Sequence, residues 1–73
     1  MARRNSGQTN QLLARNVRRL RKRKSWAQHD LASEAGVRQA LISSIEGGSA
    51  NPTLESLDKV ALALDVAVAD LLA

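Results

Sequence analysis

The strongest constraint on this chain is the stretch 28–47, where two short helical patterns flank a glycine. Apolar residues recur there at the spacing that lines one face of a helix, first at Leu31, Ala32 and Ala35 and then at Leu41, Ile42 and Ile45. Gly36 adopts a left-handed backbone at no steric cost, so it ends the first helix and redirects the chain. The pattern predicts helices over 28–34 and 38–46, joined by a tight turn.

Further helical patterns precede and follow this stretch. Leu13, Val17 and Leu20 form the apolar stripe of a helix expected from residue 10 or 11 to residue 24. Thr53 is a good N-cap for a helix that reaches residue 64, with a core stripe of Leu54, Leu57, Val60, Ala61 and Leu64. A short fifth helix is expected over 68–72. The sequence thus predicts an all-α, compact five-helix bundle over 11–73, preceded by a flexible arm over 1–10.

Charge is unevenly distributed along the chain. Residues 1–24 hold nine lysines and arginines and no acid, whereas the remainder holds two basic and seven acidic residues. The net charge is +4. A concentrated basic block favours a polyanionic partner such as nucleic acid or an anionic membrane surface. A solvated face that serves only solubility is the alternative reading of the same block.

Composition argues against several classes of function. The chain has no cysteine and one histidine, and it lacks the paired carboxylates or Ser/His/Asp set that an enzyme or metal site needs. We therefore expect no enzyme activity, metal, cofactor or small-molecule ligand. No apolar run approaches the ~20 residues of a membrane span, and no secretory leader is visible. Trp26 is expected in the core rather than as a base-stacking platform.

An ordered set of residues carries a family resemblance from about Leu12 to Leu72. The set comprises Gln28, Leu31-Ala32, Ala35-Gly36-Val37, Ile42-Ser43, Ile45-Glu46, Asn51-Pro52-Thr53-Leu54 and Leu57. It resembles the phage repressor and Cro type of helix-turn-helix protein, often called XRE-like. The resemblance implies a lambda-repressor-like fold with the helix-turn-helix at the second and third helices. It also implies sequence-specific binding to double-stranded DNA.

The resemblance assigns roles to individual residues. The helix over 38–46 would enter the major groove, with base contacts from Arg38, Gln39, Ala40, Ser43 and Ser44. Phosphate contacts would come from Gln28, Ser49, Asn51 and Arg18. The alternative is that polar residues on a short helix are simply its wet side.

Other positions are structural or depart from the family pattern. The resemblance implies an ion pair between Arg21 and Glu46 that fixes the first helix against the third. Ser25 stands where the family usually has Gly, which leaves open whether that turn keeps a left-handed residue. Ala27 replaces the usual capping Ser or Thr, a loss of about 1 kcal/mol. Asp65 replaces a helix-ending Gly and tolerates the left-handed region better than most residues.

The apolar C-terminal segment suggests a homodimer, with an interface at Val66, Val68, Leu71 and Leu72. A lid on the core of one chain is the alternative. The sequence is similar to restriction–modification controller proteins, phage regulators and antitoxins, and it does not separate these. A DNA-binding regulator in the cytoplasm, associated with the nucleoid, is the main expectation. The alternative is an antitoxin-type protein-interaction module that also binds DNA.

Overall fold

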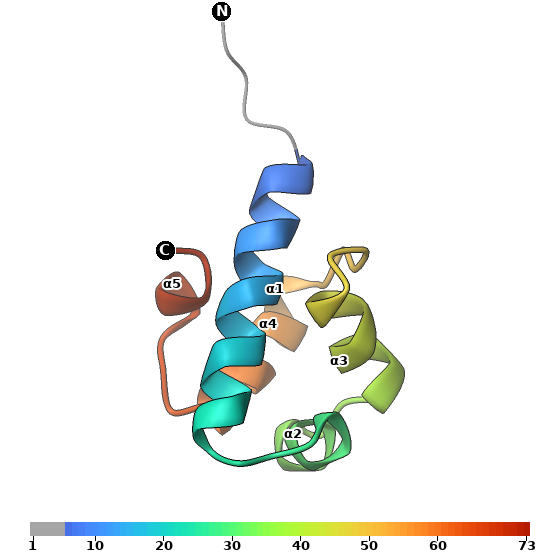
Figure 1. Ribbon diagram of the computed structural model, residues 1–73, viewed down its shortest axis with the longest axis vertical. Coiled ribbons are helices and arrows are strands. Elements are labelled where there is room, and N and C mark those ends of the chain that lie inside the picture. Colours follow the sequence, from blue (N-terminus) through green and yellow to red (C-terminus); the bar gives the residue numbers. More distant parts are fainter. Residues whose placement is uncertain (1–5) are drawn as a thin grey trace, which may run out of the picture.

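The computed structural model describes residues 6–73, and its side chains from residue 10 onward. These residues form helices and no strand, which confirms the predicted all-α class (Figure 1). The helices are α1 (Ser6–Arg23), α2 (Gln28–Ala35), α3 (Gln39–Glu46), α4 (Leu54–Ala63) and α5 (Val68–Leu71). In Figure 1, α1 runs lengthwise through the molecule, with α3 on one side, α5 on the other and α4 behind it.

The first helix starts earlier than the sequence predicted. α1 begins at Ser6 rather than at residue 10 or 11, so the part of the predicted arm over 6–10 is helical. The rest of that arm, with Arg3 and Arg4, lies outside the described residues. Leu13 and Val17 anchor α1 in the core, and residues 6–11, which include no apolar side chain, extend the helix from this anchor. The apolar pattern therefore marks where α1 is buried, not where it begins.

The core draws at least one side chain from every helix. Its fully buried large residues are Leu31, Ile42, Ile45, Leu71, Val17 and Val60. Trp26 packs against this core and is half-buried, in agreement with its predicted structural role. Leu54 was predicted as a core residue, and this is wrong, because its side chain is 68% exposed. Thr53 and Glu55 beside it are exposed too, so the first turn of α4 extends beyond the packed core.

Left-handed residues end helices where the pattern required a change of direction. Gly36 has φ 71°, and the N–H of Val37 closes the end of α2 by donating to the carbonyl of Ala32 at 3.0 Å. Ser25 has φ 59°, so serine keeps the left-handed conformation that family members reach with glycine. Asp65, at φ 61°, does the same after α4, as predicted.

Side chains also hold the helix ends. Thr53 caps α4 as predicted, since its Oγ1 accepts from the N–H of Ser56 at 3.0 Å. Ala27 makes no capping bond from its side chain, but its own N–H donates to Oδ2 of Asp30 at 2.7 Å. Asn16 is buried on α1 and its Nδ2 donates to the carbonyl of Leu71 at 2.9 Å, which fixes α5 against α1. No helix among the described residues is long and apolar enough to cross a membrane.

Candidate nucleic-acid interface

The α2–α3 unit presents one face of α3 to solvent. Ile42 and Ile45 turn inward and are buried, which anchors α3 against α1 and α2. The opposite face, and the residue before the helix, expose polar and small residues: Arg38, Gln39, Ala40 and Ser43. Ser44, predicted with this group, is half-buried, and its carbonyl accepts from the N–H groups of Ser49 and Ala50. The exposed face is therefore centred on the N-terminal half of α3.

Glu46 ends α3 with a buried carboxylate, 1% exposed, paired to a guanidinium on α1. Nε of Arg21 donates to Oε2 of Glu46 at 2.6 Å, and its Nη2 donates to Oε1 at 2.9 Å. This is the bidentate fork geometry in which an arginine holds a carboxylate most firmly. Nη1 of Arg21 donates in addition to the carbonyl of Trp26 at 2.7 Å. The ion pair expected from the sequence is present, and it joins α1, α3 and the α1–α2 turn.

Two residues with predicted phosphate contacts also reach this carboxylate. Nε2 of Gln28, at the start of α2, donates to Oε1 of Glu46 at 3.2 Å. Nε of Arg18 lies 3.7 Å from the same oxygen, while the Arg18 side chain is 55% exposed. Glu46 therefore forms a hub with Arg18, Arg21 and Gln28, which we call the Glu46 network. The sequence predicted the pair with Arg21 but not the contacts of the other two.

The network keeps Glu46 ionised. Burial alone raises the pKa of its carboxyl group, but hydrogen bonds from Arg21 and Gln28 and the positive charges of Arg21 and Arg18 outweigh burial, so its pKa falls below the ordinary value. The hydrogen bond to Glu46 raises the pKa of Arg21, against a lowering by burial and with a further rise from the charge of Glu46. The end of α3 is thus held by a charged pair.

The loop between α3 and α4 carries the remaining predicted phosphate contacts. Ser49 and Asn51 are both exposed, and Oγ of Ser49 donates to the carbonyl of Ser44 at 3.5 Å. Gly48 has φ 77°, so this loop turns through a conformation that other residues rarely adopt. The α3–α4 loop and the N-terminus of α2 thus carry polar groups that were predicted to contact phosphate.

The C-terminal residues predicted for a dimer interface differ in exposure. Val66 and Val68 are half-buried, and Leu72 is 38% exposed. Leu71 is fully buried in the core of its own chain, so the prediction that it meets a second subunit is wrong. Leu62 on α4, which the sequence analysis did not single out, is 79% exposed. Because Leu62 lies within the apolar run 60–64, its exposure was not apparent from the sequence.

Asn16 is a structural residue that the sequence analysis missed. It lies within the stripe formed by Leu13, Val17 and Leu20, so helical spacing alone marked it as a polar residue on a buried face. A buried amide needs hydrogen-bond partners, and the carbonyls of Leu71 and Ala73 supply them.

An exposed polar face on the second helix of a tight helical pair, braced from behind by a third helix, defines a helix-turn-helix protein. The comparisons agree with this geometry. The HTH_3 helix-turn-helix family pattern matches residues 17–71, and the chain belongs to that family, in its XRE type.

The chain is also similar to individual members of this family. The chain is 37% identical over 62 residues to the HTH-type transcriptional regulator SinR of Bacillus subtilis, covering 84% of this chain and 56% of that protein. The crystal structure of the hypothetical transcription factor NHTF from Neisseria superposes with a TM-score of 0.87 at 32% identity, over 100% of this chain and 84% of that one. The crystal structure of the restriction–modification controller protein C.AhdI from Aeromonas hydrophila superposes with a TM-score of 0.81 at 29% identity. The match covers 85% of this chain and 94% of that one. The three relatives are thus described as a transcriptional regulator, a hypothetical transcription factor and a restriction–modification controller protein.

Proposed function

We propose that the chain is a sequence-specific DNA-binding transcriptional regulator that places the N-terminal half of α3 in the major groove. The observation that carries this proposal is the exposed face of Gln39, Ala40 and Ser43 on a helix whose opposite face is locked into the core. Gln39 has the donor and acceptor that pair with N7 and N6 of adenine, and Ala40 suits a thymine methyl group. Arg38, which precedes the helix, and Ser43 and Ser44, which lie in its second half, would complete the base contacts.

The phosphate contacts would surround this helix. Nε2 of Gln28 carries two N–H donors, of which one reaches Glu46, so the second remains for a phosphate at the N-terminus of α2. Arg18 is half exposed, and Ser49 and Asn51 are exposed on the α3–α4 loop. Their contacts would fix the register of the protein on the duplex, while α3 reads the bases.

We further propose that the protein binds its operator as a homodimer, in the cytoplasm and on the nucleoid. Val66, Val68 and Leu72 remain candidates for the interface, and Leu62 joins them because its large apolar side chain is exposed. A two-fold dimer would place its two recognition helices about 34 Å apart, one turn of DNA. The operator would then consist of two related half-sites.

The direct test is a selection of bound duplexes from a random pool, repeated at two salt concentrations. We expect an enriched sequence whose preference over scrambled competitor persists at the higher salt, because base contacts carry sequence preference while phosphate contacts carry most of the salt dependence. Gln39→Ala should relax the preference at one base position of each half-site. A protein that binds every duplex equally would rule out the proposed function.

A further inference from the structure

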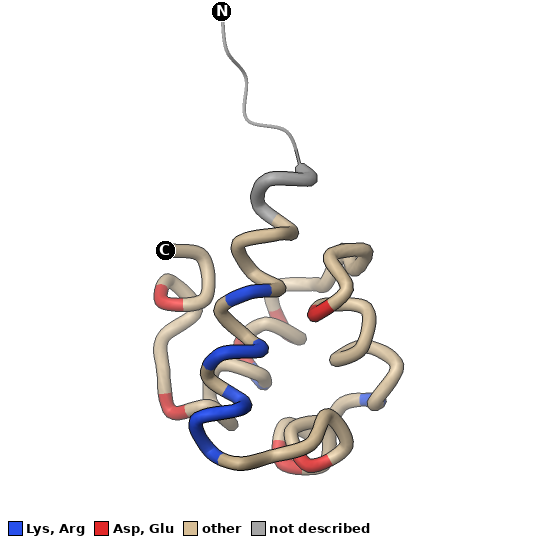
Figure 2. The backbone as a smooth tube through the Cα atoms, viewed as in Figure 1, with Lys and Arg blue, Asp and Glu red and all other residues tan. Residues whose placement is uncertain are grey.

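The exposed side of α1 carries more positive charge than the helix-turn-helix accounts for. Arg18 and Arg21 are paired with Glu46, and Lys24 with Asp65 at 2.9 Å. The other cations on the second half of α1 are exposed and form no ion pair within residues 6–73: Arg15, Arg19, Lys22 and Arg23. In Figure 2 the lysines and arginines of α1 form a blue band along the helix, and the acidic residues lie on other elements.

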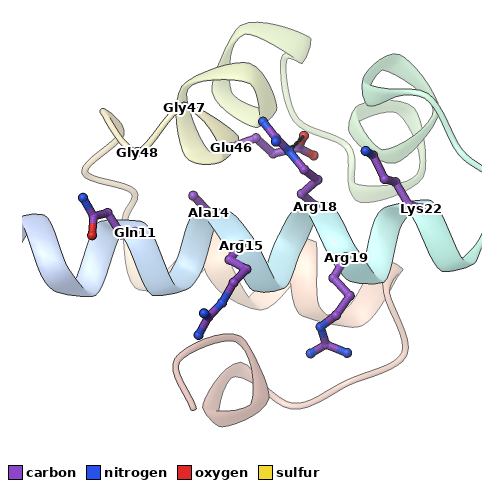
Figure 3. A pocket seen from close by; sticks show the side chains of 9 residues that line it. All are labelled: Gln11, Ala14, Arg15, Arg18, Arg19, Lys22, Glu46, Gly47 and Gly48. Atoms are coloured by element: carbon purple, nitrogen blue, oxygen red, sulfur yellow. Dashed lines mark ion pairs between the residues drawn. The ribbon is translucent and has the colours of Figure 1, made fainter.

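A groove of about 420 Å³ runs over this part of α1. In Figure 3, Arg18 and Lys22 extend from α1 toward α3 and α2, whereas Arg15 and Arg19 extend toward α5. The cations that line the groove thus extend to both sides of α1. Besides these cations, the lining includes Ala14 on α1 and Glu46, Gly47 and Gly48 at the end of α3 and after it.

The chemistry of this lining favours an extended polyanion. Gly47 and Gly48 have no side chains, so the far wall lets a ligand approach the backbone closely. Glu46 does not repel it strongly, because the guanidinium of Arg21 already compensates its charge. Ala14 is the only apolar side chain in the lining, so an acidic amphipathic helix would find no hydrophobic pocket for its anchors. A phosphodiester strand needs none.

We propose that this groove binds the sugar–phosphate backbone of DNA outside the segment that α3 reads. The inference rests on the proposed function, and it extends the surface of the protein that would contact DNA. The groove is continuous with that interface, because Arg18 belongs to both and Gly48 precedes Ser49 in the α3–α4 loop. Residues four apart on a helix are separated by about 6 Å along its axis. One strand of duplex DNA carries a phosphate about every 3.4 Å of axis, so the cations on each side of α1 can meet the strand at more than one place.

The test uses binding of the whole protein to a duplex of random sequence, over a series of salt concentrations. The variant is Arg15→Gln/Arg19→Gln, and its matched control is Arg23→Gln/Lys59→Gln, which removes the same charge from exposed residues outside the groove. All four side chains are exposed, and circular dichroism checks that both proteins fold. We expect the groove variant to flatten the slope of log K against log salt by about 1 to 2, since each lost phosphate contact removes about 0.9. The control should keep the native slope.

Each other outcome has a definite meaning. Equal slopes for the groove variant and the native protein would overturn the groove proposal, while the selection experiment could still uphold base readout by α3. Equal flattening in both variants would overturn it too, because net charge would then explain the effect. A groove variant that binds the duplex normally but loses binding to poly-L-glutamate would assign the groove to an acidic protein instead. Failure of the native protein to bind any duplex would overturn both proposals.

Discussion

The two ends of α3 differ in how they are held. The C-terminal end, here called the fixed end, finishes on Glu46, whose carboxylate has partners on α1 and α2. The N-terminal end, here called the free end, follows Arg38, whose side chain makes no capping hydrogen bond. The first end is buried and charge-paired, and the second is exposed along Gln39 and Ala40. The contrast shows how a short helix can be held rigidly and still expose side chains to a ligand. Packing fixes the axis of α3 at its C-terminal end. The exposed side chains at its N-terminal end are therefore held in a fixed orientation before a ligand binds.

The largest expected effect comes from breaking the fixed end. Arg21→Ala leaves the buried carboxylate of Glu46 without its bidentate partner and removes the bond to the Trp26 carbonyl. Loss of one member of a buried ion pair costs about 3–5 kcal/mol, so the free energy of unfolding should fall by that order. Urea unfolding measures it. The matched control is Arg23→Ala, an exposed residue two positions along α1 that should change stability by less than about 0.5 kcal/mol.

Two results would contradict this structural role for Arg21. The first is an unfolding midpoint equal to that of the native protein. The second is a changed preference among duplexes without any loss of stability, which would mean that Arg21 reads DNA rather than holding the fold.

Acid should loosen the same end by a smaller amount. The folded-state pKa of Glu46 lies below the ordinary value of about 4.3, so the network stabilises fully above that value and is lost as the pH falls through the lower folded-state pKa. Unfolding free energies measured down a pH series check this for the native protein and for Glu46→Gln. The native protein should be the more stable above pH of about 5, and the gap should narrow as acid is added. A gap that stays constant would show that Glu46 does not titrate with folding.

The free end should respond in binding and not in stability. Gln39→Ala is expected to cost about 1–3 kcal/mol in affinity for the selected duplex, because a bidentate contact to one base is lost. Its unfolding curve should match that of the native protein, since the side chain is exposed. Ser33→Ala, an exposed substitution on α2, is the control for both measurements. An equal loss of affinity on random DNA would assign Gln39 a phosphate contact instead of base reading.

The same contrast separates what the sequence could predict from what it could not. The α2–α3 unit follows from local signals, because apolar spacing and one left-handed glycine act over a few residues. The pairing of Arg21 with Glu46 followed from the family resemblance. The partners of Asn16 and the burial of Leu71 could not be predicted in the same way, since both depend on packing between segments 55 residues apart. The start of α1 at Ser6 was not predicted because residues 6–11 are polar or glycine and so show no apolar periodicity.

The smallest expected effect is a substitution at the free end of α3 that changes both stability and DNA binding. Arg38 has φ −72° and ψ 144°, the extended geometry of an N-cap residue, so a serine there could bond the first free N–H groups of α3 without moving the backbone. Arg38→Ser should therefore raise the free energy of unfolding by about 1 kcal/mol. It should also weaken DNA binding, because a cation at the start of the recognition helix is lost. Ala27→Ser adds a cap to α2 at a matching extended position and keeps Arg38, so it should stabilise without that loss. If Arg38→Ser gained stability and bound the selected duplex as tightly as the native protein, the missing cap would have no connection with DNA.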